Sequence, residues 1–106
     1  MSISALLRLA RQSADLRCRG LAKMCGLAPA TISLAELGDL EYSDRTRRLV
    51  LGVLLREVAR AQGIQQPRCI SELEVRRELS RLIAAAEVMR AERALLSADA
   101  VLATWA

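Results

Sequence analysis

The sequence predicts an all-α protein, and three features of its composition support that fold class. Leu, Ala, Arg and Glu, all strong helix formers, dominate its 106 residues. The single Tyr, the single Trp and the absence of Phe disfavour a β-rich core, which depends on aromatic and β-branched side chains. Two prolines and five glycines leave room for long helices between them.

The first third of the chain contains the signals for three helices. Apolar residues at helical spacing follow an early serine that can cap the first helix, which breaks near residues 13–15. A second helix is expected from about 17 to 25, because Gly26 supplies the left-handed conformation that ends a helix. Pro29 suits the first turn of a third helix, and Gly38 ends it.

A fourth, longer helix and a linker follow. Ser43 or Asp44 can cap this helix, which ends before Gly63. A proline soon after that glycine is typical of a connection between two helical units. The sequence therefore predicts a domain, a linker and a C-terminal helical region, over residues 1–62, 63–70 and 71–106 respectively.

The C-terminal region carries a heptad pattern. Ser71 and Glu74 form a capping box that starts a long helix, and Ser97 or Asp99 is expected to cap a last short one. Apolar residues in the long helix recur at alternating spacings of four and three, at Val75, Leu79, Leu82, Ala86 and Met89. We expect this seam to hold a homodimer, because a chain this short buries only a limited core. The alternative is that the helix folds back on the domain's own core.

The excess positive charge is concentrated near the N-terminus. Residues 1–34 contain five basic side chains and one acidic one, whereas residues 35–106 contain eleven arginines and eleven carboxylates. The net charge of +4 therefore belongs to the first segment. Such clustering favours nucleic acid as a partner. The alternative is an arginine-rich surface that is simply solvated.

Several classes of function are disfavoured. The three cysteines, Cys18, Cys25 and Cys69, form no CxxC pair, and the chain has no His, so no metal site is expected. The pattern is typical of reduced thiols in a cytoplasmic protein, and no stretch is long and apolar enough to predict a membrane span. Without a nucleophile–base pair or a phosphate-binding glycine loop, we expect neither an enzyme nor a cofactor.

The spacing over residues 9–54 resembles the Cro/CI (XRE, lambda-repressor-like) family of helix-turn-helix regulators. The matching positions are Leu21, Ala22, Gly26 and Leu27 in the second helix and turn, Thr31, Ile32, Ser33, Glu36 and Gly38 in the recognition helix, and Ser43, Thr46 and Leu49 in the fourth. Inward positions of this motif explain Leu21, Ala22, Cys25, Ile32 and Ala35 as core residues. The resemblance implies a helix-turn-helix bundle, with the C-terminal region as an appended dimerisation element.

The resemblance also implies roles for individual residues. Arg11 is expected to pair with Glu36, which ties the first helix to the end of the third. Base contacts in the major groove of double-stranded DNA are expected from Pro29, Ala30, Thr31 and Leu34. Phosphate contacts are expected from Arg17, Arg19 and Lys23. The implied function is a dimeric, sequence-specific transcriptional regulator, a repressor of phage, plasmid or antitoxin type.

A second function class remains open. Only Thr31 among the expected base-contacting residues has a polar side chain, and the segment after the third helix is acidic at Asp39 and Glu41. Leu34, Leu37, Leu40 and Tyr42 are expected to form an exposed apolar patch, a feature more typical of protein contacts. The alternative function is a helix-turn-helix scaffold that binds and inhibits a protein partner.

Overall fold

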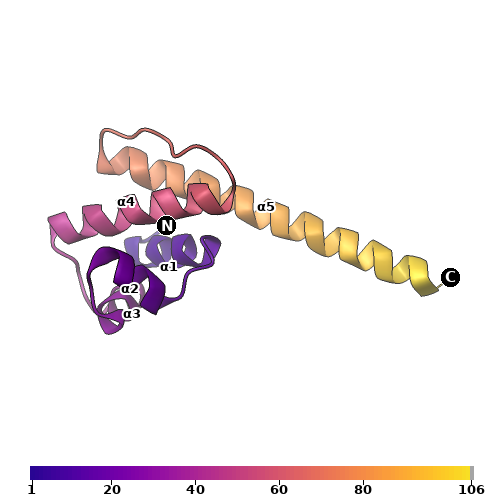
Figure 1. Cartoon of the computed structure of the whole chain (residues 1–106), viewed down its shortest axis with the longest axis horizontal. Helices are drawn as coiled ribbons and strands as arrows, with labels where there is room; N and C mark the ends of the chain where they lie inside the picture. Colours follow the sequence, from indigo (N-terminus) through magenta and orange to yellow (C-terminus); the bar gives the residue numbers. More distant parts are fainter. Residues whose placement is uncertain (106) are drawn as a thin grey trace.

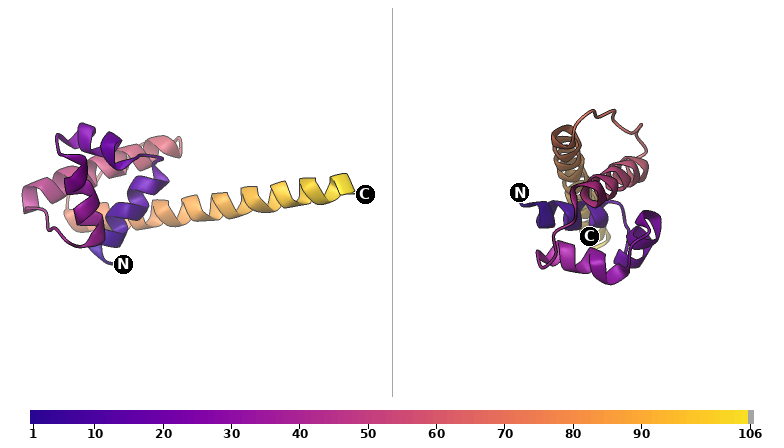
Figure 2. Two further views of the ribbon diagram at one scale, coloured as in Figure 1. Left: turned by 90° about the horizontal axis from the view of Figure 1, so that it is seen from below. Right: turned by 90° about the vertical axis from the view of Figure 1, so that its left-hand side faces the viewer.

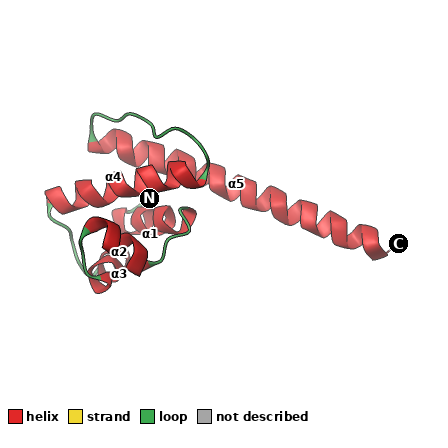
Figure 3. Cartoon of the chain, in the orientation of Figure 1, coloured by secondary structure: helices red, strands yellow, loops and turns green. Residues whose placement is uncertain are grey.

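The structure, a computed structural model, describes residues 1–105. Its regular structure is helical, and no strand occurs within those residues (Figure 3). The helices are α1 (Ile3–Ser13), α2 (Cys18–Cys25), α3 (Pro29–Leu37), α4 (Asp44–Ala61) and α5 (Glu72–Trp105). The all-α prediction is confirmed. Ala106, the last residue of the expected C-terminal region, lies outside the described residues.

Serine side chains begin three of the helices. The Ser2 hydroxyl accepts a hydrogen bond from the backbone N–H of Ala5, and Ser43 accepts one from Thr46, both at 3.2 Å. These bonds satisfy donors that the first turn of a helix leaves without a partner. The capping box of α5 is also present: the Ser71 hydroxyl accepts from the N–H of Glu74 at 3.2 Å, and the Glu74 carboxylate accepts from the preceding loop.

Helices α1 to α4 and the first part of α5 surround one apolar core (Figures 1 and 2). Helix α1 packs against α3, α4 and α5, and α2 packs against α3 and α4. The largest fully buried side chains are Leu21, Ile32, Val50, Leu51, Leu54, Leu55, Val58, Leu79 and Leu82. They come from every part of this assembly except α1, which contributes Leu6, Leu7 and Ala10 to the same core. We call residues 3–83 the body.

Polar bonds fasten α5 to α4 at two levels. Near the start of both helices, Glu72 accepts hydrogen bonds from Arg47 and Arg76, each at 2.9 Å. Burial opposes ionisation of Glu72, but the bonds and charges of the two arginines prevail and lower its pKa. Near the end of α4, the side-chain amide of Gln62 donates to the backbone carbonyl of Leu82 at 2.6 Å. The two helices therefore form one unit along the whole length of α4.

The structure corrects the expected five-residue dimer seam. Leu79 and Leu82 are fully buried in the core of their own chain, and Val75 packs against the same core. They are covered because residues 62–71 return the chain so that α5 lies beside α4 (Figure 1). Only Ala86 and Met89, from the other end of the seam, lie beyond the buried stretch. The alternative of a helix folded back on the domain's own core accounts for the first three positions.

The second half of α5 leaves the body and continues as a free-standing helix (Figures 1 and 2). Every residue from Glu87 to Trp105 is exposed. The predicted break before a last short helix is wrong, because α5 passes through Ser97 and Asp99 without interruption. Exposed polar side chains of this kind are tolerated within a helix when they point into solvent. We call residues 84–105 the projecting helix.

Candidate nucleic-acid interface

Helices α2 and α3 are joined by a tight turn that depends on Gly26. Gly26 ends α2 with a φ of +67°, a backbone angle that residues other than glycine rarely adopt. The N–H of Leu27 donates to the carbonyl of Ala22 at 2.9 Å, which closes the turn. Ala28 is extended and Pro29 begins α3 without needing a hydrogen-bond partner for its nitrogen.

The inner faces of the two helices pack into the core and so fix which residues face outward. The inward positions expected from the sequence are all buried: Leu21, Ala22, Cys25, Ile32 and Ala35. Burial raises the pKa of the Cys25 thiol, although the charge of the nearby Arg56 opposes this effect. The thiol is therefore a core group, as predicted.

The start of α3 is open to solvent. Pro29, Ala30 and Leu34 are exposed, and Thr31 is partly exposed. The structure adds Ser33, an exposed hydroxyl on the same helix that the motif-based prediction omitted. Its position one turn after Pro29 is the signal that identifies it, because residues four apart share a helix face. Near its N-terminus, α3 therefore offers two accessible polar side-chain groups, the hydroxyls of Thr31 and Ser33.

Three cations on or next to α2 accompany this surface. Arg17 is the N-cap residue of α2, and its side chain makes no capping hydrogen bond. Arg19 and Lys23 are exposed on the helix itself. Within residues 1–105, none of the three forms an ion pair with a carboxylate. Their charges are consequently available to an anionic partner.

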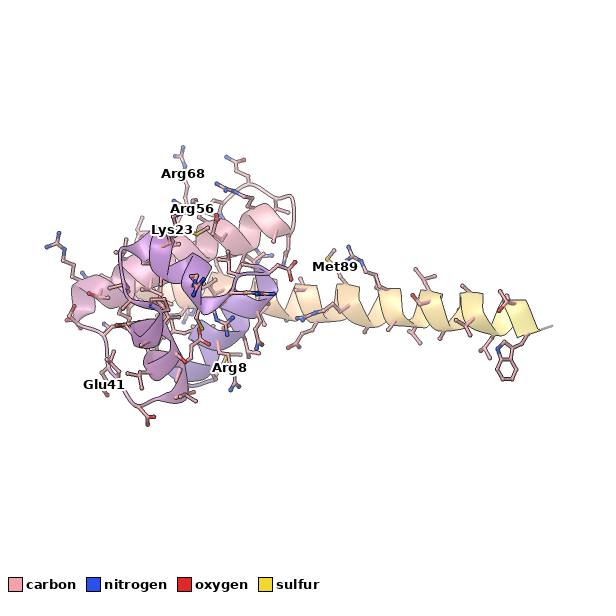
Figure 4. The ribbon with its side chains drawn as sticks, turned by 60° about the horizontal axis from the view of Figure 1, so that its bottom comes forward. Arg8, Lys23, Glu41, Arg56, Arg68 and Met89 are labelled. Atoms are coloured by element: carbon pink, nitrogen blue, oxygen red, sulfur yellow. The ribbon has the colours of Figure 1, made fainter. Side chains whose placement is uncertain are left out.

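The acidic segment lies on a different side of the body. In Figure 4, Lys23 and Arg56 lie together on one side of the body, whereas Glu41 lies on the other. Asp39 and Glu41 are both exposed. The carboxylates after α3 therefore do not neutralise the cation of Lys23.

The expected four-residue apolar patch does not form. Leu34 and Leu37 are exposed on α3, but Leu40 and Tyr42 pack partly buried against the core. Burial raises the pKa of Tyr42 to about 12, because the phenolate would lose its hydration. The loop after α3 thus turns its apolar side chains toward the body and its carboxylates toward solvent.

A bidentate ion pair holds α3 in place. Arg11 donates to both carboxylate oxygens of Glu36, at 2.7 and 2.8 Å, and its third donor bonds the carbonyl of Leu16 at 2.8 Å. The side chains of Arg11 and Glu36 are 15% and 7% exposed. The hydrogen bonds to Glu36, despite burial, raise the pKa of Arg11. This is the predicted pair, and it links α1, the loop before α2 and the end of α3.

Two other kinds of site were sought in the described part of the chain. No three His, Cys, Asp or Glu side chains among residues 1–105 lie close enough together to hold a metal ion. None of the five helices combines the length and apolarity needed to cross a membrane.

Comparisons of the chain with protein-family models, curated proteins and solved structures found no match. The interpretation of the α2–α3 surface therefore rests on its own geometry and charge.

Proposed function

We propose that this protein is a transcriptional regulator that binds double-stranded DNA sequence-specifically and acts as a dimer. In this proposal α2, the turn at Gly26 and α3 form a helix-turn-helix of the Cro/CI type, and α3 enters the major groove. The observation that carries the proposal is the set of unpaired cations on or next to α2, Arg17, Arg19 and Lys23, together with the open start of α3, the helix that packs against α2. Within residues 1–105 all three cations are exposed.

The two helices would have different tasks on DNA. The cations at α2 would contact phosphates, which supplies affinity without sequence preference. Thr31 and Ser33 offer hydroxyls to base edges, and Ala30 and Leu34 offer apolar contact to thymine methyl groups. These contacts discriminate less than bidentate ones, so the deformability of the DNA would contribute part of the preference.

A salt series on duplex binding tests the proposal. Arg17→Ala and Arg19→Ala should weaken binding about equally for all sequences. Each should also reduce the slope of log affinity against log salt by about 0.9, the value for one phosphate contact on B-DNA. Arg77→Ala is the matched control, because Arg77 is an exposed arginine on the first part of α5, which packs against α1 and α4. The control should keep the wild-type slope.

Base contacts are tested by selection from random duplexes. Thr31→Val keeps the methyl group but removes the hydroxyl, and Leu34→Ala removes the apolar contact. Both should change the preferred sequence while non-specific affinity stays near wild type. If the wild-type protein binds no duplex even at low salt, DNA binding is rejected.

A second candidate function is supported by the exposure of Leu34 and Leu37 on α3. Two neighbouring exposed leucines suit the apolar centre of a protein–protein contact. In that case the same scaffold binds and inhibits a protein partner. Leu37→Asp would then abolish partner binding, while the arginine substitutions at α2 would change nothing on DNA.

A further inference from the structure

The projecting helix exposes an apolar surface that continues along its whole length. Its exposed large apolar residues are Val88, Met89, Leu95, Leu96, Val101, Leu102 and Trp105. A helix that is apolar on most sides is normally covered by other protein. The segment contains 22 residues, 84–105, and therefore extends about 33 Å. Every residue from Glu87 to Trp105 is exposed, and the described chain approaches this stretch only where Met89, Arg90 and Arg93 border a pocket with the ends of α1 and α4.

One line of residues on this helix is uninterrupted by charge. Positions spaced alternately four and three apart are all apolar: Ala84, Val88, Ala91, Leu95, Ala98, Leu102 and Trp105. This heptad spacing is the pattern of a two-helix contact. We call these seven residues the distal seam. It lies beyond the residues that the body uses, unlike the seam expected from Val75 to Met89.

We propose that the distal seam pairs with the same seam of a second copy of this chain, with the two helices antiparallel. Two properties of the segment favour a second copy as the occupant. Its apolar heptad pattern is sustained over 22 residues, about three heptads, which is the length that indicates a coiled coil. None of its two arginines and three carboxylates lies on the seam, so pairing of two copies buries no charge.

The sizes of the seam residues set the direction. Large side chains, Val88, Leu95 and Leu102, alternate with Ala at three of the other four positions. In an antiparallel pair each layer joins one position of each kind, so Leu95 meets Ala98 of the second copy. Large then faces small in the layers that join Leu95 with Ala98 and Leu102 with Ala91, which is the condition for dense packing, and Val88 packs against Trp105 in the outermost layers. In a parallel pair, layers of two alanines would alternate with layers of two leucines and leave gaps.

Antiparallel pairing places the two bodies at opposite ends of a rod. With Leu95 opposite Ala98, the two copies of Ile83, where the bodies end, lie about 40 Å apart along the rod, and each body carries its own α2–α3 surface. Binding of one DNA molecule by both surfaces is a consequence that rests on the proposed function. The pairing itself does not, and its test uses no DNA.

Two adjacent leucines provide the decisive comparison. Leu95 and Leu96 are 67% and 69% exposed, but only Leu95 belongs to the distal seam. Leu95→Glu should raise the dimer dissociation constant about 100-fold or more, because each copy would bury a charge. Leu96→Glu has the same cost to the helix and should leave the dissociation constant within a few-fold of wild type. Sedimentation equilibrium measures both.

Trp105 reports the same event by fluorescence. It is the only Trp in the chain and is 83% exposed. Its emission should shift to shorter wavelength as protein concentration rises, in wild type and Leu96→Glu but not in Leu95→Glu. Three results overturn the proposal: a wild-type monomer at tens of micromolar, equal behaviour of the two variants, or an emission shift of a monomer only on phosphatidylcholine vesicles.

The direction is measured by the distance between spin labels. A nitroxide is attached at Thr104→Cys, in a chain with Cys18→Ser and Cys69→Ser; Cys25 is buried and stays. Antiparallel pairing with Leu95 opposite Ala98 separates the two copies of residue 104 by about 22 Å along the rod. Parallel pairing leaves the labelled backbones about 10 Å apart, one interhelical spacing. The shorter separation would overturn the antiparallel arrangement.

Discussion

The body and the projecting helix are made from the same residue types but use them differently. Leucine, alanine and valine fill the core of the body, and in residues 84–105 the same side chains face solvent. The two aromatic residues show the contrast directly: Tyr42 packs against the core, whereas Trp105 is exposed. Both regions belong in part to one helix, α5. Burial in this protein therefore depends on what the rest of the chain places beside a residue.

The largest expected difference between the two regions is in the free energy of unfolding, when leucine is replaced by alanine at two positions of α5. Leu82→Ala should cost about 2–5 kcal/mol, because Leu82 is 1% exposed and its removal leaves a cavity. Leu102→Ala should cost less than about 0.5 kcal/mol at low protein concentration, because Leu102 is 66% exposed. Urea unfolding of both variants, at a concentration where the chain is monomeric, gives the two values. Equal losses would show that the projecting helix is part of the cooperative unit.

A second prediction separates buried charge from exposed charge. Glu36→Ala should cost about 3 kcal/mol or more, because it leaves the guanidinium of Arg11 partly buried without its partner. The control is Arg81→Ala, which breaks the equally short pair between Arg81 and Glu78. That pair is exposed, so its loss should cost at most about 1 kcal/mol. Thermal unfolding compares them, and an unchanged melting temperature for Glu36→Ala would contradict the role given to the Arg11 pair.

The smallest effect concerns Tyr42 and pH. Tyr42 is the only Tyr in the chain, and its tyrosinate absorbance should appear with a midpoint of about 12. Because the pKa of Tyr42 in the folded chain lies above its ordinary value of 10.0, Tyr42 contributes its full stabilisation below about pH 10. This contribution is lost as pH rises through about 12. A Tyr42 midpoint near 10 would show that its ring is solvated.

Features that depend on local chemistry were predictable from the sequence. The serine caps at Ser2, Ser43 and Ser71 and the turn at Gly26 are fixed by neighbouring backbone groups. The Arg11–Glu36 contact was also anticipated, although it joins residues far apart in the chain. It came from the resemblance to a known motif rather than from the local pattern.

Features that depend on which segment packs over a given apolar face were not predictable from the sequence. The heptad at Val75, Leu79 and Leu82 is equally suitable for a second chain or for α4, and periodicity does not distinguish the two. The distal seam is hard to recognise in the sequence, because three of its seven positions are alanine and a fourth is the aromatic Trp105. Leu40 and Tyr42 were misplaced for the same reason, since a loop has no period that indicates its inner side.

The continuity of α5 has a mechanical consequence. The helix contains neither glycine nor proline from Glu72 to Trp105, and hydrogen bonds hold its first turns to α4. It is therefore a continuous helix with no hinge between the body and anything bound at its C-terminal end. Each inserted residue would rotate that end by about 100° and advance it by about 1.5 Å. In the proposed pair, the number of residues in α5 therefore sets how far one body is rotated relative to the other.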